Sequence, residues 1–376
     1  MQLGILVVGL GTIGQTWLQD YAERLPANVF VHAAANSKHV WRWPLPEGWQ
    51  NQREPQVVEG AIVAEIKNLV QQGVATVVLD LTASKQVSRD YLAWIDAGAH
   101  IISANKYAGS SNPDYYQTLR ERLQNRQRHW LYNTTVGAGL PIQKAIRERL
   151  DCFDAITAME GNFSGSLSWI FQQYRPGDKL SDWLRKAAEL GYTEPDPRID
   201  FSGMDVARKL LILARDAGWA FQLSEVELHN LVPPALQQVS LETFWQELEQ
   251  FDEAFDCWRL KHHPDAKQFC YIGKVEEAPS GNVRAFAQLQ PIDVNLIAGG
   301  LLVFSFSMLE VSDSLILAQR SDHFPITKMI YEFTNRLGDG QYIASAMGVW
   351  GMTLLTVTLV GASVMMGKKL GSIFRV

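Results

Sequence analysis

The first third of the chain alternates short apolar runs with amphipathic stretches. Apolar runs that predict buried strands occupy residues 4–8, 29–35, 76–81 and 100–103. Apolar positions at helical spacing predict helices over residues 15–25, 62–72 and 91–97. Strands that alternate with helices build a parallel sheet with right-handed crossovers. We therefore predict an α/β fold with a doubly wound parallel sheet.

This alternation ends near Pro141, and residues 155–163 begin a new unit. Pro141 is expected to open a helix, because a proline is tolerated in the first turn. The prolines of residues 194–198 exclude a helix there. Further helices are predicted over residues 142–150, 180–190, from a cap at Ser202 or Gly203 through Ala214, and over residues 245–258.

The last part of the chain carries a nearly continuous apolar run over residues 344–366, followed by Lys368 and Lys369. The run is long enough to cross a bilayer. Polar residues and several glycines interrupt it, which favours a buried strand and helix of a globular domain and leaves membrane insertion as the alternative. From these changes of pattern we divide the chain into residues 1–145, 146–325 and 326–376.

Length and composition fit two or three globular units. The chain has 376 residues, of which 47% are hydrophobic and 20% charged. Its net charge of −6 does not fit the basic stripe that nucleic-acid binding requires. The three cysteines are far apart and predict no disulfide framework, and the start of the chain lacks a signal-peptide pattern. We therefore expect a cytoplasmic protein without a nucleic-acid partner.

A glycine-rich turn follows the first predicted strand. Gly9, Gly11 and Gly14 form a GxGxxG motif between that strand and a predicted helix, the context that dinucleotide binding requires. Gly9 permits a tight turn, Gly11 lets a pyrophosphate approach the backbone, and Gly14 lets helix and strand lie close together. Free N–H groups at the helix N-terminus attract phosphate. The pattern predicts a Rossmann-type nucleotide domain.

The end of the second predicted strand indicates which nucleotide is bound. A site for NAD usually ends this strand with an acidic residue that holds the ribose 2′-hydroxyl. Here the strand ends in Asn36, Ser37 and Lys38, which could hold a 2′-phosphate. We predict NADPH, with NADH as the alternative. The other interpretation of Lys38 is an ordinary solvated lysine in a loop.

Polar residues also follow the third and fourth predicted strands. Thr82 and Ser84 come after the strand at residues 76–81, and Asn105 and Lys106 come after the next strand. The carboxyl ends of parallel strands share one edge of the sheet, where ligands bind. We therefore expect these side chains at the nucleotide site.

Four carboxylates precede Lys209 in one short stretch: Glu194, Asp196, Asp200 and Asp205. Asp205 and Lys209 are four residues apart and so share one face of the predicted helix. One interpretation is a surface ion pair worth less than about 1 kcal/mol. The other is a site for a cationic ligand such as a substrate ammonium, since clustered carboxylates repel one another without a cation. Lys209 would then lie between the acids and the nicotinamide.

Five motifs occur in order along the chain: GLGTIG at 9–14, NK at 105–106, VGAGLP at 136–141, GNFSGSLSWIF at 161–171 and GYTEPDPRIDFSGMDVARK at 191–209. They resemble the motifs of the homoserine dehydrogenases, most of all the dehydrogenase half of bifunctional aspartokinase–homoserine dehydrogenases. The last two are long and specific, and the similarity extends from residue 1 to about residue 235. It implies an α+β substrate and dimerisation domain over residues 146–325, and a homodimer or higher homo-oligomer.

The resemblance also implies roles for individual residues. Lys209 matches the general acid/base lysine that moves the proton of the homoserine hydroxyl, and Lys106 matches the lysine that orients substrate and cofactor. Positions that hold the substrate or shape its site are Gly191, Glu194, Asp200 and Asp205. Positions that contact the cofactor are Thr12, Ile13, Thr82 and Lys106.

A monovalent cation is a further implication of the resemblance. The family holds a sodium-like ion with backbone carbonyls, which here belong to Val136, Ala138 and Leu140. Some members complete that site with a glutamate, where this chain has Asn133. The ion is therefore an open expectation.

The activity implied is reversible NAD(P)-dependent hydride transfer between L-homoserine and L-aspartate 4-semialdehyde, a step of threonine, methionine and isoleucine biosynthesis. In the family the chain returns to the nucleotide domain through a glycine-rich loop, and residues 338–345 resemble that loop only partly. The alternative is thus a catalytically impaired NADPH-binding relative, associated with a membrane through its altered tail. A thioester-forming semialdehyde dehydrogenase is set aside, because none of the cysteines lies in a suitable loop.

Overall fold

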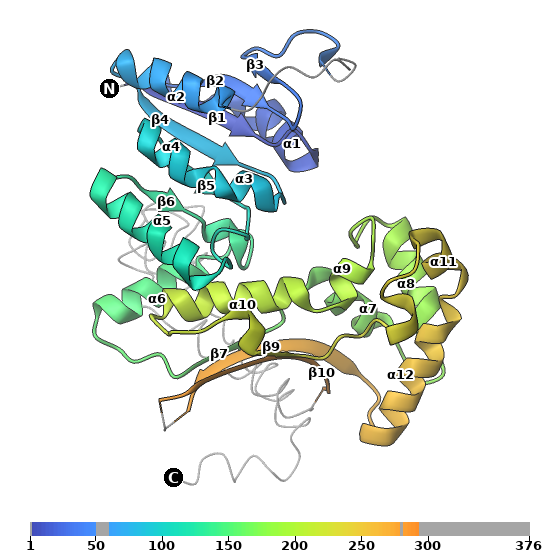
Figure 1. The fold of residues 1–376 in the computed structure, drawn as a ribbon. Coiled ribbons are helices and arrows are strands. Elements are labelled where there is room, and N and C mark those ends of the chain that lie inside the picture. Colours follow the sequence, from blue (N-terminus) through green and yellow to red (C-terminus); the bar gives the residue numbers. More distant parts are fainter. Residues whose placement is uncertain (1, 50–59, 279–280, 293–376) are drawn as a thin grey trace, which may run out of the picture. The chain divides into compact units, whose positions relative to one another are not determined.

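The computed structural model describes residues 2–49, 60–278 and 281–292 (Figure 1). Residues Met1–Gln290 form one compact unit, which contains two β-sheets. The predictions for residues 326–376, including the apolar run at 344–366 and the partial glycine-rich loop at 338–345, lie outside the described residues.

The first sheet has six strands in the order β3-β2-β1-β4-β5-β6. All neighbouring strands are parallel except β3, which runs antiparallel to β2. The strand order reverses at β1, which lies between β2 and β4, and ligands of such sheets bind at this switch point. The predicted doubly wound α/β fold is confirmed. The strands are β1 Leu3–Val8, β2 Val29–Ala35, β3 Val40–Arg42, β4 Ala75–Asp80, β5 His100–Ser103 and β6 Trp130–Leu131.

Helices connect these strands, and apolar side chains recur on one face of each helix. Leu18 of α1 and Ile66 of α2 are buried in this way. Asn112 caps α5 by accepting a hydrogen bond from the backbone of Tyr115, and Pro113 occupies its first turn. The α-helices are α1 Thr12–Tyr21, α2 Ala61–Gln71, α3 Lys85–Arg89, α4 Tyr91–Ala97 and α5 Pro113–Arg126, and the short 3₁₀ helices are η1 Ala22–Arg24 and η3 Asn133–Thr135.

The second sheet has four strands in the order β7-β9-β10-β8, with β7 antiparallel to β9. Its strands are β7 Ala158–Gly161, β8 Val226–Leu228, β9 Phe269–Glu277 and β10 Val283–Pro291. Helices α7 and α10 lie against β9 and bury an aromatic core that includes Phe171, Phe201 and Tyr271. The surrounding helices are α6 Ile142–Asp151, α7 Gly165–Gln173, α8 Leu180–Glu189, α9 Arg198–Phe201, α10 Met204–Asp216, α11 Leu241–Gln246, α12 Glu249–His262, η4 Leu223–Glu225 and η5 Pro234–Leu236.

Two predicted features of this part are wrong. The single helix expected over residues 245–258 is divided: α11 ends at Gln246 and α12 begins at Glu249, with buried Leu248 just before it. Phe251 and Phe255 of α12 face the core, so this helix is not merely an acidic surface helix. The helix α9 was not expected beside the prolines; Pro197 lies just before its first residue, where a proline is tolerated.

Candidate functional site

The three motif glycines differ in the space around them. Gly9 has a φ of 104°, and a Cβ atom there would lie 2.7 Å from Cγ2 of Thr82. A Cβ atom on Gly14 would lie 1.9 Å from the carbonyl oxygen of Gly9. A Cβ atom on Gly11 would meet nothing within 4 Å. The turn therefore has no room for a side chain at Gly9 and Gly14 but does have room at Gly11. Thr12 and Ile13 begin α1 directly after Gly11, and their side chains are exposed.

The end of β2 forms a tight turn around Asn36. The Oδ1 atom of Asn36 accepts hydrogen bonds from the backbone N–H groups of Lys38, at 2.8 Å, and His39, at 2.9 Å. The Asn36 side chain thus builds the turn, while Ser37 and Lys38 are exposed next to β1. The described part of this turn contains no carboxylate that would oppose a 2′-phosphate.

A buried carboxylate that the sequence analysis did not single out organises the end of β4. Asp80 is fully buried, and its Oδ2 accepts hydrogen bonds from the Tyr91 hydroxyl, at 2.7 Å, and from Nδ2 of Asn105, at 3.0 Å. Its Oδ1 accepts the backbone N–H of Thr82 at 2.8 Å. Burial raises the pKa of Asp80 above its usual value, although these hydrogen bonds oppose the shift.

Asn105 connects the ends of β4 and β5. Its Nδ2 also lies 3.2 Å from Oγ1 of Thr82 and 2.9 Å from the carbonyl oxygen of Ser84, and its Oδ1 accepts the N–H of Tyr107. Ser84 in turn caps α3 by accepting the N–H of Val87. Three of the polar residues predicted at this edge, Thr82, Ser84 and Asn105, are therefore brought together, whereas the Lys106 side chain pairs with Asp205.

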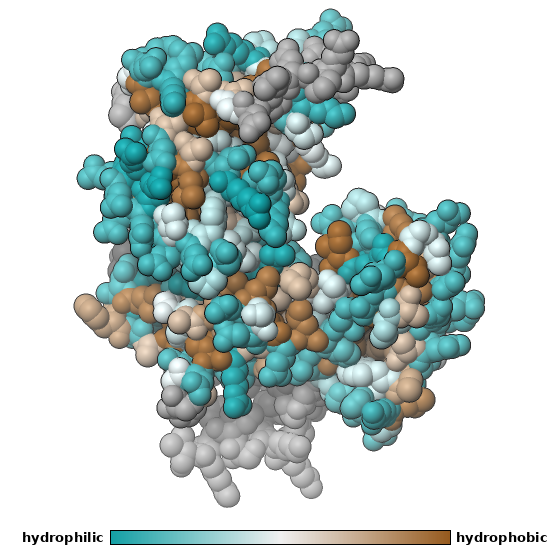
Figure 2. Space-filling view, in the orientation of Figure 1, coloured by the Kyte–Doolittle hydropathy of each residue, from teal (hydrophilic) through white to brown (hydrophobic). Residues whose placement is uncertain are grey.

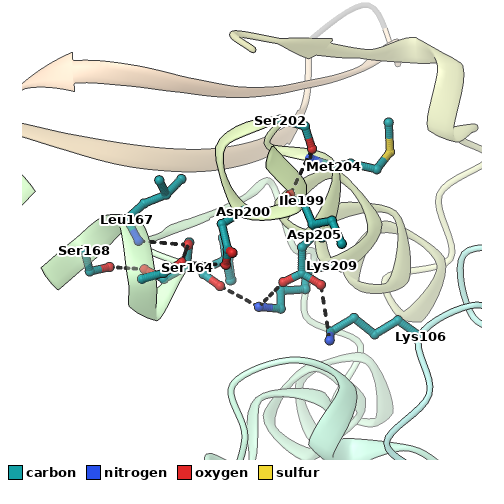
Figure 3. A network of polar contacts seen from close by, with 12 residues as sticks. Lys106, Ser164, Leu167, Ser168, Ile199, Asp200, Ser202, Met204, Asp205 and Lys209 are labelled. Atoms are coloured by element: carbon teal, nitrogen blue, oxygen red, sulfur yellow. Dashed lines mark hydrogen bonds and ion pairs between the residues drawn. The ribbon is translucent and has the colours of Figure 1, made fainter. Parts of the chain in front are cut away.

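One carboxylate lies between two lysines from different parts of the chain (Figure 3). Oδ2 of Asp205 is 2.7 Å from Nζ of Lys209, and its Oδ1 is 3.2 Å from Nζ of Lys106. Nζ of Lys209 also donates to the carbonyl oxygen of Phe163 at 2.6 Å. The Lys209 side chain is only 16% exposed. The pair predicted on one face of α10 thus has a third member from the end of β5, which an isolated surface ion pair would lack.

The acids beside this cluster differ in their charge environment. Burial acts to raise the pKa of Asp205, but the charges of Lys106 and Lys209 outweigh it and hold the pKa below its ordinary value. Burial, together with the nearby charge of Asp205, raises the pKa of Asp200. Asp200 accepts hydrogen bonds from Oγ of Ser166, at 2.8 Å, and from the backbone N–H of Glu194, at 2.9 Å.

The prediction that four carboxylates crowd one turn is wrong for Asp196. Its side chain pairs with the guanidinium of Arg198, at 2.7 Å, which already supplies the missing cation. Arg198 also donates to the carbonyl oxygen of Val239 at 2.6 Å, so the Asp196–Arg198 pair is attached to the segment before α11. Asp200 remains beside Asp205, while Glu194 and Gly191 are exposed on the preceding loop.

Helix α10 also fixes the loop that carries Lys106. The guanidinium of Arg208 lies 4.4 Å from the ring centre of Tyr107 and donates to Oγ of Ser110 at 3.0 Å. Arg215 donates to the carbonyl oxygens of Gly109, at 2.7 Å, and Ser111, at 2.8 Å. The sequence analysis missed this attachment, whose signal is the spacing of two arginines on one face of α10.

The backbone proposed for the monovalent cation has mixed surroundings. Val136 is buried, whereas Ala138 and Leu140 are exposed, and the carbonyl oxygen of Leu140 accepts the N–H of Ile142 at 2.9 Å. Asn133 lies exposed in η3. Among the described residues, no group of three or more His, Cys, Asp or Glu side chains is arranged to hold a metal ion, and no helix has the length and hydropathy to span a membrane.

Two family models match consecutive parts of the chain. Residues 9–133 match the model described as the NAD binding domain of homoserine dehydrogenase, and residues 141–294 match the model described as homoserine dehydrogenase. The two matches contain the glycine turn and the lysine–aspartate cluster respectively, apart from Lys106, which lies in the first match.

Curated relatives are bifunctional enzymes that are much longer than this chain. A bifunctional aspartokinase/homoserine dehydrogenase 2 of Escherichia coli is 44% identical over 177 residues, which are 47% of this chain and 22% of that protein. A bifunctional aspartokinase/homoserine dehydrogenase of Haemophilus influenzae is 35% identical over 286 residues, which are 73% of this chain and 35% of that protein. The chain thus spans about a third or less of these relatives.

A solved structure shares the fold. A hyperthermophilic archaeal homoserine dehydrogenase in complex with NADPH matches with a TM-score of 0.55 and 17% identity, over 78% of this chain and 83% of that chain. At this identity the likeness shows the fold and not the activity.

Proposed function

The chain belongs to the homoserine dehydrogenase family, and from this premise we propose that it interconverts L-homoserine and L-aspartate 4-semialdehyde with a nicotinamide cofactor. The observation that carries the proposal is the cluster of Lys106, Asp205 and Lys209. It brings a helix of the second sheet's domain to the end of β5, the edge of the first sheet where a nucleotide binds.

The residues around the glycine turn fit a dinucleotide. A pyrophosphate would lie beside Gly11, where an added Cβ would meet nothing within 4 Å, and next to the first N–H groups of α1. Thr82 and Ser84 would line the nicotinamide end of the site, with Asp80 holding Thr82 in place. When bound, the cofactor accepts or donates the hydride at the alcohol carbon of the substrate.

The chain's own residues would supply the proton transfer. In its neutral amine form Lys209 takes the hydroxyl proton of homoserine as the hydride leaves the same carbon, and in the reverse direction its ammonium form gives that proton to the forming alkoxide. Asp205 holds the Lys209 amine in position, and the Phe163 carbonyl fixes it from a second direction. Because its pKa is lowered, Asp205 remains charged at neutral pH and balances both lysines. Lys106 orients substrate and cofactor from the opposite side.

The acids on the loop before α9 would hold the substrate's ammonium group. Glu194 and Gly191 lie on this exposed loop, and Asp200 anchors it through the N–H of Glu194. An exposed Glu194 carboxylate is available to a cation, whereas both oxygens of Asp200 already accept hydrogen bonds. We therefore assign Glu194 to the ammonium and Asp200 to the shape of the loop.

The proposed cofactor is NADPH. Ser37 and Lys38 are exposed at the end of β2, where the 2′-phosphate would lie, and the Asn36 turn presents them. The archaeal structure of this fold is a complex with NADPH. A sodium-like ion at the carbonyls of Val136 and Ala138, a homodimer and a cytoplasmic location are further parts of the proposal.

A coupled assay tests this function directly. Purified protein is given homoserine with NADP or NAD, and aspartate semialdehyde with NADPH or NADH, and the cofactor absorbance is followed. The proposal expects turnover in both directions, faster with the phosphorylated cofactor. Cofactor binding without turnover would instead support the catalytically impaired relative, which no observation on residues 2–49, 60–278 and 281–292 favours.

A further inference from the structure

A groove of about 760 Å³ lies on the face of the compact unit that carries α3. Its lining comes from α3, from the start of α5, from the first half of α10 and from η4. Ser88, Tyr107 and Tyr115 contribute to its lining, and the Tyr115 hydroxyl donates to the carbonyl oxygen of Ser88. A volume of this size holds a small molecule. The groove's lining contains none of the residues assigned above to cofactor, substrate or proton transfer.

Among the described residues, the charged side chains that line this groove are all positive. Three cations, Lys85, Arg89 and Arg208, line it, and the described lining contains no carboxylate. In the described part of the chain these three cations form no ion pair. Figure 2 shows hydrophilic side chains gathered over α3. Lys85 and Arg89 are exposed on α3, and cations without an ion pair leave donors to solvent or to an anion.

The carboxylates nearest in sequence lie outside the lining, although burial, together with the charge of Asp90, raises the pKa of the lining residue Tyr115. Asp90 and Asp114 follow Arg89 and Pro113 but do not line the groove. Glu225, next to the lining residue Ser224, already accepts the backbone N–H of Gln222 at 2.7 Å. The positive charge of the groove is therefore open to a ligand.

Arg208 links the groove to the lysine–aspartate cluster. It precedes Lys209 in α10, and it uses one N–H on Oγ of Ser110, whose hydroxyl donates to the carbonyl oxygen of Lys106. A guanidinium has five N–H donors, so others remain for a bound anion. An anion on Arg208 would hold α10 and the loop after Lys106 together.

We propose that this groove binds a small molecule with at least two anionic groups, phosphate or carboxylate, between the cations of α3 and Arg208. Two groups are needed because the cations lie on different walls. Charged hydrogen bonds on both walls give such a ligand an advantage over a monoanion. Its occupancy stabilises the position of the Lys106 loop on α10.

Calorimetric titration with citrate and with pyrophosphate tests the site and separates carboxylate from phosphate ligands. The full chain is titrated with NADPH present, so that the dinucleotide-phosphate site is filled. We expect millimolar or tighter binding of at least one anion, weakening with salt. Lys85→Glu and Arg89→Glu should each weaken it by about tenfold or more. Lys67→Glu and Arg24→Glu, exposed cations elsewhere on the same sheet domain, are the matched controls and should leave it unchanged.

Hydrogen exchange gives a second readout. Bound anion should slow exchange in residues 107–112 and 204–208 and leave residues 9–14 unaffected. The proposal is overturned if neither anion binds, if both α3 variants bind like the parent, or if NADPH abolishes the binding. If NADPH itself does not bind, the proposed dehydrogenase function fails, while the groove is still judged by the response of the α3 variants.

Discussion

Replacing Asp205 by asparagine removes one negative charge from between two lysines and keeps the shape of the side chain. The amide oxygen can still accept a hydrogen bond from one lysine, whereas the second contact and the charge balance are lost. The ammonium groups of Lys106 and Lys209, now held 3.2 and 2.7 Å from a neutral side chain, repel each other without compensation. We expect both amines to move from the positions that proton transfer requires.

The size of the effect follows from the two contacts. A hydrogen bond to a charged group contributes about 1.5–3 kcal/mol net. The Asp205 side chain is 38% exposed, so solvent screening places each contact at the lower end of that range. Losing one contact and part of the other costs about 2 kcal/mol in the transition state, or about thirtyfold in kcat/KM.

Steady-state kinetics of homoserine oxidation measures this change, with circular dichroism to show that the variant is folded. Asp196→Asn is the matched control, because Asp196 lies in the same stretch but pairs with Arg198. It should cost stability and leave kcat/KM close to that of the parent. A folded Asp205→Asn enzyme within about threefold of the parent would refute the assigned role of Asp205.

Three further predictions concern stability and the surroundings of the site. Gly14→Ala should lower the free energy of unfolding by about 2 kcal/mol or more and abolish cofactor binding, because its Cβ would lie 1.9 Å from a backbone oxygen. Denaturation and fluorescence titration measure the two effects. Gly165→Ala is the control, because the space around its Cβ is open. Because the pKa of Asp205 is lowered in the folded protein, its stabilising contribution is present above the unfolded-state pKa near 3.8 and is lost as pH falls through the folded-state pKa. The difference in unfolding free energy between the parent and Asp205→Asn should therefore vanish in acid. A difference that urea unfolding shows to be independent of pH contradicts this. Arg215→Met removes two hydrogen bonds to the Lys106 loop and should lower the free energy of unfolding by about 3 kcal/mol. Hydrogen exchange in residues 106–111 should become faster in this variant. It should not change in Arg149→Met, which replaces an exposed arginine elsewhere.

Local patterns determined most of what the sequence predicts correctly. The need for glycine at positions 9 and 14 depends on nearby atoms of the turn and of the neighbouring strand's end, so it follows from the GxGxxG motif in its context. The spacing of Asp205 and Lys209 places both on one helix face wherever that helix lies. The parallel sheet followed from apolar runs in the same way.

Contacts between distant segments explain what the sequence did not predict. The role of Asp80 depends on Tyr91 and Asn105, which reach it from other elements. The Phe163 carbonyl lies beside Lys209 although the two residues are 46 apart in the chain, and both α7, which follows Phe163, and α10 contact β9. Asp196 was misjudged because its partner Arg198 is held by the carbonyl oxygen of Val239, which is distant in the sequence.

A double-mutant cycle on kcat/KM tests the central claim, that Asp205 acts in catalysis through the Lys209 amine. Lys209→Ala should lower kcat/KM by about a hundredfold or more, the low end for general acid–base catalysis. Because Asp205 serves to hold that amine, adding Asp205→Asn to Lys209→Ala should cost little more. If instead the two losses multiply, the residues act independently, and the coupling of Asp205 and Lys209 is contradicted.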